Sequence, residues 1–283
     1  MNSINRAATS LFDVLFQPFE LLGEGWSLIL WSSIFGVLAL LVFKHISSQK
    51  GIKAAKDKIK GHMIAIRLYQ DDLAIVAQSV TKVLGRNVQY LFLNFGPILP
   101  LMLPFTIVAA QFVVRYAFDP LPVQASEQLM PGQGTLVEIS LHDGERARIA
   151  GLTLELPSGV EALSPLVRDR VAGRAWQEVV CTAPVHDELR ILLDGQEVGR
   201  KAIVAGTERP RHMQPERVAN FFEAWLWPAE ETYAGSPVAK VKFAYPDHDL
   251  GWLPGGTGGV LLVFILASIA AGVLALKPLK IQI

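Results

Sequence analysis

Residues 44–115 join a basic, polar stretch directly to a long apolar run, and this junction strongly limits what the chain can fold into. Residues 44–86 carry nine Lys or Arg against three Asp or Glu. The run that follows, residues 90–114, is long and apolar enough to cross a bilayer. Another apolar run, residues 26–43, ends just before the basic stretch. Because Lys and Arg gather in cytoplasmic loops, the pattern predicts a cytoplasmic segment between two transmembrane helices.

The composition indicates a membrane protein that also has a polar domain. The 283-residue chain is 51% hydrophobic, with a mean hydropathy of +0.34. Its net charge is zero, but residues 119–254 carry 13 basic and 20 acidic residues, the opposite balance to residues 44–86. Such asymmetry is typical of segments on opposite sides of a membrane. The single cysteine, Cys181, cannot form an intramolecular disulfide and is predicted to be a small buried residue.

Three transmembrane helices are predicted, at residues 26–43, 90–115 and 259–276. The second contains Pro97, Pro100 and Pro104 on one side of a helix, so we expect it to be bent. In the third, Gly272 lies among alanines, where a neighbouring helix can approach closely.

The basic residues that flank these helices predict the orientation of the chain. Lys44 follows the first helix and Lys277 follows the third. If these ends are cytoplasmic, residues 44–89 and the tail 277–283 lie inside, and the N-terminus and residues 119–254 lie outside. The expected location is therefore the cytoplasmic (inner) membrane, with the lipid bilayer as one partner.

Residues 1–25 are predicted to form an amphipathic helix that is bent near Pro18. Two interpretations remain open, because such a helix either lies in the membrane interface or docks against the later polar domain. A signal peptide is not expected, since the start of the chain is not basic. The apolar residues at helical spacing are Leu11, Phe12, Leu15, Phe16, Phe19 and Leu22.

Residues 44–89 are predicted to form a helical hairpin with a polar turn at residues 69–72, where Asp71 or Asp72 is a suitable N-cap. Its basic side chains attract anionic lipid headgroups, or ribosomal RNA or a nascent chain. A third interpretation is a solvated face that only enforces topology. The basic residues singled out are Lys53, Lys56, Lys60 and Arg67.

Residues 119–254 are predicted to form a β-sandwich-like domain. A hairpin is expected around Asp194-Gly195, and a helix is expected over residues 215–226. The predicted fold class is therefore α + β: three transmembrane helices with a cytoplasmic helical hairpin, and an extracytoplasmic β-domain. The predicted strands are residues 134–141, 146–156, 176–182, 188–193, 197–205 and 238–245.

No catalytic motif is found in the sequence. His186 and His248 each have acidic neighbours, but they lack metal-site spacing and are predicted to be solvated loop residues. The glycine-rich residues 255–259 precede an apolar helix and are predicted to be a linker. No enzyme activity, metal, cofactor or DNA partner is expected. Arg115 either lines a hydrophilic groove or lies at the interface with its side chain among headgroups.

Two stretches, QKGIKAAKDKIKGHMIAIRLYQDD and FGPILPLMLPF, together with the order of the helices, resemble the Oxa1 superfamily of membrane protein insertases, the group of YidC and Oxa1. The resemblance implies a hydrophilic membrane groove, open to cytoplasm and lipid, that lowers the cost of moving a client's polar flank across the bilayer. It implies no cofactor and no covalent chemistry.

Three functional hypotheses follow. The first is an insertase-like or chaperone-like protein whose basic hairpin receives nascent membrane proteins or the ribosome. The second is a non-catalytic scaffold or accessory subunit that binds an envelope protein through its outer β-domain. The third is an envelope enzyme that uses His186 or His248. In the first, the groove residues would be Ser32, Ser33, Asn94, Gln111 and Arg115.

Overall fold

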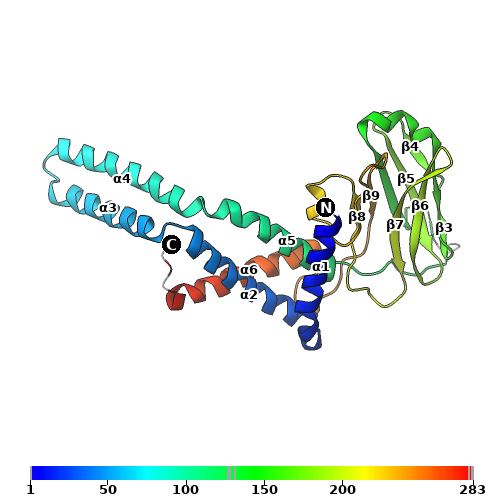
Figure 1. Ribbon diagram of the computed structural model, residues 1–283, viewed down its shortest axis with the longest axis horizontal. Coiled ribbons are helices and arrows are strands. Elements are labelled where there is room, and N and C mark those ends of the chain that lie inside the picture. The colour runs from blue at the N-terminus through cyan, green and yellow to red at the C-terminus, as the bar shows by residue number, and fades with distance from the viewer. Residues whose placement is uncertain (1, 126–128, 131, 280, 282–283) are drawn as a thin grey trace. The chain divides into compact units, whose positions relative to one another are not determined.

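The computed structural model describes residues 2–125, 129–130, 132–279 and 281, and it is an α + β protein (Figure 1). The chain divides into two compact units. The β unit comprises Met1–Leu28 and Ile107–Leu262, and the helical unit comprises Ile29–Thr106 and Val263–Ile283. The predicted tail 277–283 lies partly outside the described residues.

Three segments are long and apolar enough to cross a membrane, as the sequence predicts. They are α2 (Glu24–Ile46), the pair α4 (Leu73–Phe95) and α5 (Ile98–Tyr116), and α6 (Gly256–Leu279). The predicted helix over residues 90–115 is interrupted at Gly96 and Pro97, which separate α4 from α5 within one long apolar segment. Pro97 has no amide hydrogen to donate, so the ladder of helical hydrogen bonds stops there.

The helical hairpin of the helical unit agrees with the prediction. Helix α3 (Gln49–Leu68) packs along α4, and a short turn joins them. The Ser48 hydroxyl accepts a hydrogen bond from the amide of Gly51 and caps α3. Asp72, one of the two predicted caps, accepts hydrogen bonds from the amides of Ala74 and Ile75 at 2.9 and 3.1 Å. These caps satisfy amides that have no partner within their helix.

Helices α2 and α6 cross closely within the helical unit. A side chain at Gly36 would begin 2.2 Å from the carbonyl oxygen of Ser268, so only glycine allows this distance. The Ser268 hydroxyl donates to the carbonyl oxygen of Ser32 at 2.9 Å. Phe264 packs against Phe35 of α2 and Phe105 of α5, with ring centroids 5.7 and 4.5 Å away. A small-residue contact, a hydrogen bond and an aromatic cluster therefore hold α2, α5 and α6 together.

Replacing Gly36 with leucine is expected to lower the melting temperature of the detergent-solubilised protein. The new Cβ atom would lie 2.6 Å from the Cα atom of Ser268, so a helix has to move, at a cost of about 1–3 kcal/mol or more. Gly85→Leu is the matched control, because a Cβ atom at Gly85 meets no atom within 4 Å. Equal melting temperatures for the two variants would contradict the close crossing.

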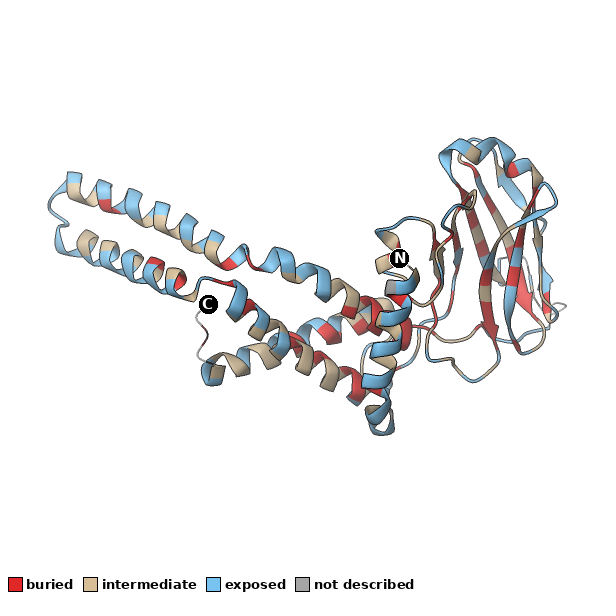
Figure 2. Cartoon of the chain, viewed as in Figure 1, coloured by how far each residue is buried: buried red, intermediate tan, exposed pale blue. Residues whose placement is uncertain are grey.

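The β unit contains two antiparallel sheets, as expected of a sandwich-like domain. One sheet has the order β3-β5-β1-β9-β8, with β4 also paired to β5, and the other has the order β2-β6-β7. Each sheet buries one face, which Figure 2 shows in red along the strands. The strands are β1 (Thr135–Leu141), β2 (Leu152–Glu155), β3 (Val160–Ala162), β4 (Val167–Asp169), β5 (Arg174–Cys181), β6 (Val185–Leu193), β7 (Gln196–Ala205), β8 (Glu216–Val218) and β9 (Val238–Phe243).

The predicted hairpin is confirmed, because β6 and β7 are joined at Asp194-Gly195. Both residues have positive φ angles, 55° and 81°, as a tight two-residue hairpin turn requires.

Two expectations for this domain are wrong. Most of residues 146–156 belong to the 3-10 helix η3 (Asp143–Gly151), and only β2 is a strand. The helix expected over residues 215–226 is absent from the described chain. There, β8 pairs with the free edge of β9, and one 3-10 turn follows, η4 (Glu223–Trp225). Strand pairing satisfies the edge of β9, and this long-range partner overrides the local helical spacing.

Residues 2–22 form helix α1 (Asn2–Phe16) and the 3-10 helix η1 (Gln17–Leu22), so the regular helix ends just before Pro18. The polar face of α1 docks within the β unit, since the Asn5 amide donates to the carbonyl oxygen of Ala224 at 2.9 Å. Phe16 is buried, whereas Leu11 of the same predicted apolar face is 59% exposed. The docking interpretation is therefore observed, with an apolar surface left uncovered.

Candidate functional site

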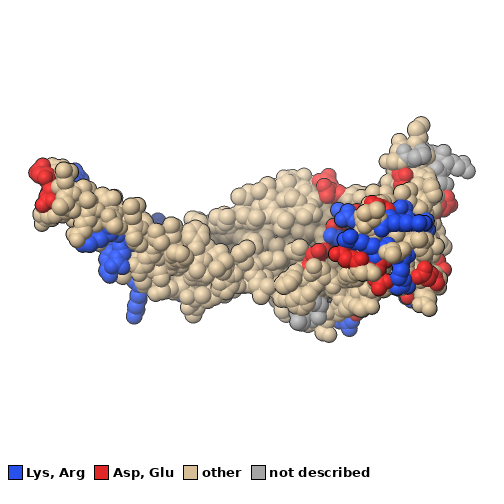
Figure 3. All heavy atoms as spheres, turned by 90° about the horizontal axis from the view of Figure 1, so that it is seen from above, with Lys and Arg blue, Asp and Glu red and all other residues tan. Residues whose placement is uncertain are grey.

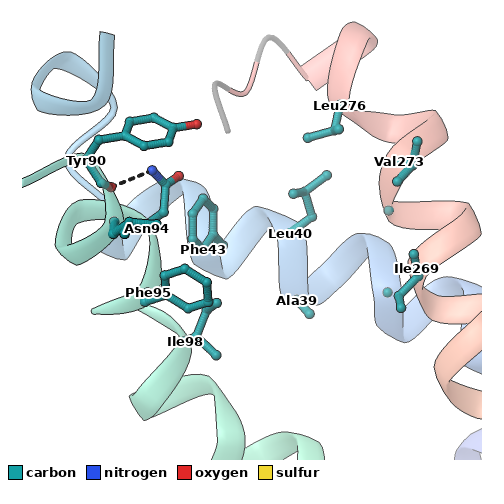
Figure 4. A pocket seen from close by; sticks show the side chains of 13 residues that line it. Ala39, Leu40, Phe43, Tyr90, Asn94, Phe95, Ile98, Ile269, Val273 and Leu276 are labelled. Atoms are coloured by element: carbon teal, nitrogen blue, oxygen red, sulfur yellow. Dashed lines mark hydrogen bonds between the residues drawn. The ribbon is translucent and has the colours of Figure 1, made fainter. Parts of the chain in front are cut away.

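An apolar groove opens in the helical unit between α2, α6 and the junction of α4 with α5. Its volume is about 470 Å³, within the usual range for small-ligand sites of roughly 300–1,000 Å³. No charged side chain is among the 13 residues described around it (Figure 4). The lining residues are Gly36, Ala39, Leu40, Phe43, Tyr90, Leu91, Asn94, Phe95, Ile98, Ile269, Gly272, Val273 and Leu276.

Asn94 has the one side-chain amide among these 13 lining residues, to which Tyr90 adds a hydroxyl, and Asn94 is 9% exposed. Its nitrogen donates a hydrogen bond of 2.7 Å to the carbonyl oxygen of Tyr90, which is drawn as a dashed line in Figure 4. Its buried oxygen Oδ1 has no hydrogen-bond partner among the described residues. A buried acceptor without a partner costs roughly 1–3 kcal/mol. The groove wall therefore carries one polar atom that a donor group or a water molecule would stabilise.

The four singled-out basic residues lie on α3. They are spaced three, four and seven residues apart, which places them on one face of the helix. Lys53, Lys60 and Arg67 are exposed. The Lys56 ammonium lies 5.8 Å from the ring centroid of Tyr90, a residue of the groove. Figure 3 shows several Lys and Arg side chains gathered along one edge of the hairpin. Because Lys56 lies beside Tyr90, the basic face of α3 reaches the groove.

Two other groove candidates, Ser32 and Ser33, belong to α2. Ser32 is fully buried, and its carbonyl oxygen accepts the hydrogen bond from Ser268 described above. Ser33 is partly exposed. Neither is among the residues that line the groove, since the α2 side of the groove is formed by Gly36 and the residues that follow it.

The last two candidates, Gln111 and Arg115, belong to the β unit and bind α1. The Gln111 amide nitrogen donates to the Thr9 hydroxyl at 3.0 Å. The Arg115 guanidinium donates to Asp13 at 2.5 Å and lies 4.9 Å from the ring centroid of Phe16. Arg115 is only 5% exposed, so it is a buried ion-pair residue that fastens α1. Of the five candidates, the structure thus brings Asn94 alone into the groove lining.

His212 completes the cluster around Arg115. Its Nε2 atom lies 3.0 Å from an Arg115 nitrogen and 2.9 Å from Asp13. Burial lowers the pKa of His212 from its ordinary 6.5, and the charges of Arg115 and Arg211 act in the same direction. Asp13 acts in the opposite direction but does not reverse the shift. The folded protein therefore holds His212 neutral at a pH where the unfolded chain protonates it.

We expect the free energy of unfolding to fall as the pH decreases through about 6.5. Below that pH the unfolded chain binds a proton on His212 that the folded chain does not, and one proton contributes at most about 1.4 kcal/mol per pH unit. The melting temperature is measured between pH 7.5 and 5.5. Its decrease with falling pH should be smaller in His212→Gln than in the wild-type protein. His186→Gln, at an exposed site on β6, should keep the wild-type slope. If the melting temperature of both variants depends on pH as in the wild-type protein, His212 is not the cause of the pH dependence.

His248 is not the solvated loop residue that the sequence predicts. Its Nδ1 atom lies 2.7 Å from Asp119, and its Nε2 atom lies 2.6 Å from Glu24. Arg209 also pairs with Glu24. His186 is exposed on β6, beside the exposed Asp187 and Glu188. The partners of His248 are 129 and 224 positions away in the sequence, so local spacing cannot reveal them.

The described part of the chain was also searched for residues that could bind a metal ion. No group of three or more His, Cys, Asp or Glu among the described residues has an arrangement that could hold a metal ion. Cys181 is buried, as predicted, and burial raises its thiol pKa to about 11. A thiol with this pKa is almost entirely protonated at neutral pH and is a poor nucleophile.

Comparison with protein-family models, with curated proteins and with solved structures found no match for this chain. The groove, the basic hairpin and the β unit are therefore the features from which a function can be inferred.

The sequence did not identify the groove residues of α2 and α6. Both helices are apolar all round, so no periodic pattern separates side chains that line the groove from those that face outward. The sequence feature that marks the groove on these two helices is the position of small residues, since Gly36 and Gly272 both line it. Of these two glycines, the sequence predicts a close helix approach only at Gly272.

Proposed function

We propose that this protein is a membrane-embedded, insertase-like or chaperone-like protein that holds an apolar segment of another membrane protein in the groove of its helical unit. The observation that carries the proposal is the groove itself. It is lined mostly by apolar side chains and has one buried side-chain amide among its described lining residues. The family resemblance implies a hydrophilic groove, and the apolar lining departs from that expectation, so the proposal rests on the groove and not on the resemblance.

The proposed orientation follows the basic residues. Helix α2, the end of α4 together with α5, and α6 cross the cytoplasmic membrane, with α3, the first part of α4 and Lys277 in the cytoplasm and the β unit outside. The Lys44 ammonium donates to the carbonyl oxygen of Leu279 at 2.8 Å, so the basic end of α2 caps the last turn of α6. On the outer side, the exposed apolar residues of α1 would lie in the membrane interface.

The groove accounts for how a client segment would be held. In a bilayer there is no hydrophobic force between helices, so close packing and hydrogen bonds decide association. The lining offers an apolar surface for packing, and the unpaired Oδ1 of Asn94 offers an acceptor to a polar group of the client. The basic face of α3 would attract acidic residues of the client before its apolar segment enters.

Site-specific photocrosslinking tests this proposal. A photoreactive amino acid at Leu40, in the groove, is expected to crosslink to a ribosome-stalled membrane protein that exposes one transmembrane segment. Filling the groove with Val273→Trp should reduce the crosslink about 10-fold, equivalent to about 1.4 kcal/mol of binding. Leu274→Trp, at the next position of α6 and outside the groove lining, should leave it unchanged.

No crosslink from Leu40, or an equal loss in both tryptophan variants, would refute the proposal. A partner that instead crosslinks only to the β unit, with the groove variants without effect, would favour the scaffold hypothesis.

A further inference from the structure

A second apolar surface runs along α4 on the hairpin, outside the helix contacts of the helical unit. Its residues are exposed although they are apolar: Leu73 is 82% exposed and Leu84 is 62% exposed. The pale blue along α4 in Figure 2 marks exposed residues over most of the helix. We call the full set the α4 stripe: Leu73, Ala77, Val80, Leu84, Val88, Leu91 and Phe95.

The spacing of the α4 stripe is regular. Successive members are 4, 3, 4, 4, 3 and 4 residues apart, which makes two repeats of 11 residues. An 11-residue repeat gives 3.67 residues per turn, close to the value of 3.6 for a straight α-helix, so the stripe stays on one face. It extends over about 33 Å at 1.5 Å per residue. This is the pattern of a helix that packs along a second, nearly straight helix.

Helix α3 does not cover the stripe. The α4 residues that are turned toward α3 belong to another face and include the buried Ser79 and the partly buried Val83 and Tyr90. On the helical wheel this face is about 120° from the α4 stripe. Contiguous exposed apolar surface on a soluble segment usually marks an interaction site.

The charges of the hairpin define the partner. Helices α3 and α4 carry eight Lys or Arg and one acidic residue, Asp57. On α4 the charged residues are Lys82 and Arg86, both basic. A second copy of this chain in the same membrane would bring like charges together along parallel α4 helices, which is unfavourable. Acidic residues beside an apolar stripe would be attracted instead.

We propose that the part of the α4 stripe from Leu73 to Val88 binds an amphipathic helix of a partner protein. The partner helix has apolar residues at 11-residue spacing and acidic residues on either side of them. The proposal rests on the membrane orientation proposed above but not on a client in the groove. Helix α4 is continuous from Leu73 to Phe95. Its cytoplasmic part, from Leu73 to Val88, therefore extends away from the membrane-spanning end of the helix and does not lie on the lipid surface. The last stripe residues, Leu91 and Phe95, also line the groove, so the two apolar surfaces are continuous.

The test measures fluorescence anisotropy of a labelled synthetic peptide with the full-length protein in phosphatidylcholine nanodiscs. The peptide is a 22-residue helix with Leu at the 11-residue spacing and Glu on the flanks. The stripe variant, Val80→Glu with Leu84→Glu, is expected to weaken binding at least about 10-fold. The control, Gln78→Glu with Gln89→Glu, adds the same charge to other exposed positions of α4 and should change binding less than about 3-fold.

A peptide with Lys in place of Glu should bind the wild-type protein at least about 10-fold more weakly. No peptide binding, or equal losses in the two variants, would overturn the proposal. These variants do not alter Leu40 or Val273, so crosslinking in the groove is measured independently of peptide binding. The groove proposal and the α4 proposal can therefore fail separately.

Two further outcomes would identify a different occupant. A polarity-sensitive dye attached at Leu84→Cys is expected to keep its emission when phosphatidylglycerol is added to the nanodiscs without peptide. A blue shift would instead identify anionic lipid as the occupant. A disulfide between two Leu84→Cys chains in one bilayer would identify a second copy. Cys181 is 2% exposed, so it does not compete for the label.

Discussion

Replacing Lys201 with alanine is expected to destabilise the β unit by about 3–5 kcal/mol, the usual cost of removing one partner of a buried ion pair. Lys201 is fully buried on β7, where its ammonium donates to the carbonyl oxygen of Gln214 at 2.9 Å and pairs with Glu230. Burial lowers the pKa of Lys201, although Glu230 acts in the opposite direction. The alanine variant leaves Glu230 without its counter-charge. Hydrogen exchange of β6 and β7 amides in increasing urea measures the loss.

Two further variants check the cause of this loss. Arg200 is the neighbour of Lys201, and its ion pairs with Glu188 and Glu197 lie at the surface. Arg200→Ala should therefore lower the free energy of unfolding by less than about 1 kcal/mol. The double variant Lys201→Met with Glu230→Gln removes both charges and should be more stable than Lys201→Ala. A double variant as unstable as Lys201→Ala would show that packing, not the unpaired carboxylate, causes the loss.

Replacing Arg115 with methionine is expected to release α1 from the β unit, with a local loss of about 3 kcal/mol. Arg115 is the buried partner of Asp13, and its guanidinium also contacts His212 and the ring of Phe16. Methionine keeps the packing volume but leaves Asp13 without its cation. Amides of residues 2–16 should then exchange with solvent roughly 100-fold faster, since each 1.4 kcal/mol corresponds to a factor of ten.

Arg6→Ala is the matched control for Arg115. Arg6 belongs to α1 and pairs with Glu231, but both side chains are more than half exposed. Such surface pairs contribute roughly 0–1 kcal/mol, so exchange of α1 should change little. Unchanged exchange in Arg115→Met, or equal changes in both variants, would refute the role of Arg115 as the fastening residue.

The local structure of this protein is largely encoded in short stretches of sequence. The turn at Asp72 is a side-chain cap followed by an apolar helical pattern, and the turn at Asp194-Gly195 uses residues that tolerate positive φ. The three long apolar segments follow from composition alone. Pro97 is a helix-distorting residue by its chemistry, and the interruption that it causes is confined to residues 96 and 97.

The arrangement of the candidate site was far less predictable. Asn94, Gln111 and Arg115 look alike in sequence, as polar residues in one apolar run. In the structure, Asn94 lines the groove. Gln111 instead binds Thr9 and Arg115 binds Asp13, and each partner is 102 positions away. A single sequence contains no local signal for such a pairing, because the partner is chosen by the folded chain and not by neighbouring residues.

The sequence by itself determined the apolar segments, the basic hairpin and most strands of the β unit. These depend on hydrophobic periodicity, capping and turn residues, which act over a few positions. Only the tertiary structure decided which apolar side chains line the groove, which remain exposed on α4, and that residues 216–218 form a strand. The physical reason is that burial and edge pairing depend on contacts between distant segments, and the free energy of those contacts exceeds the small differences in local propensity.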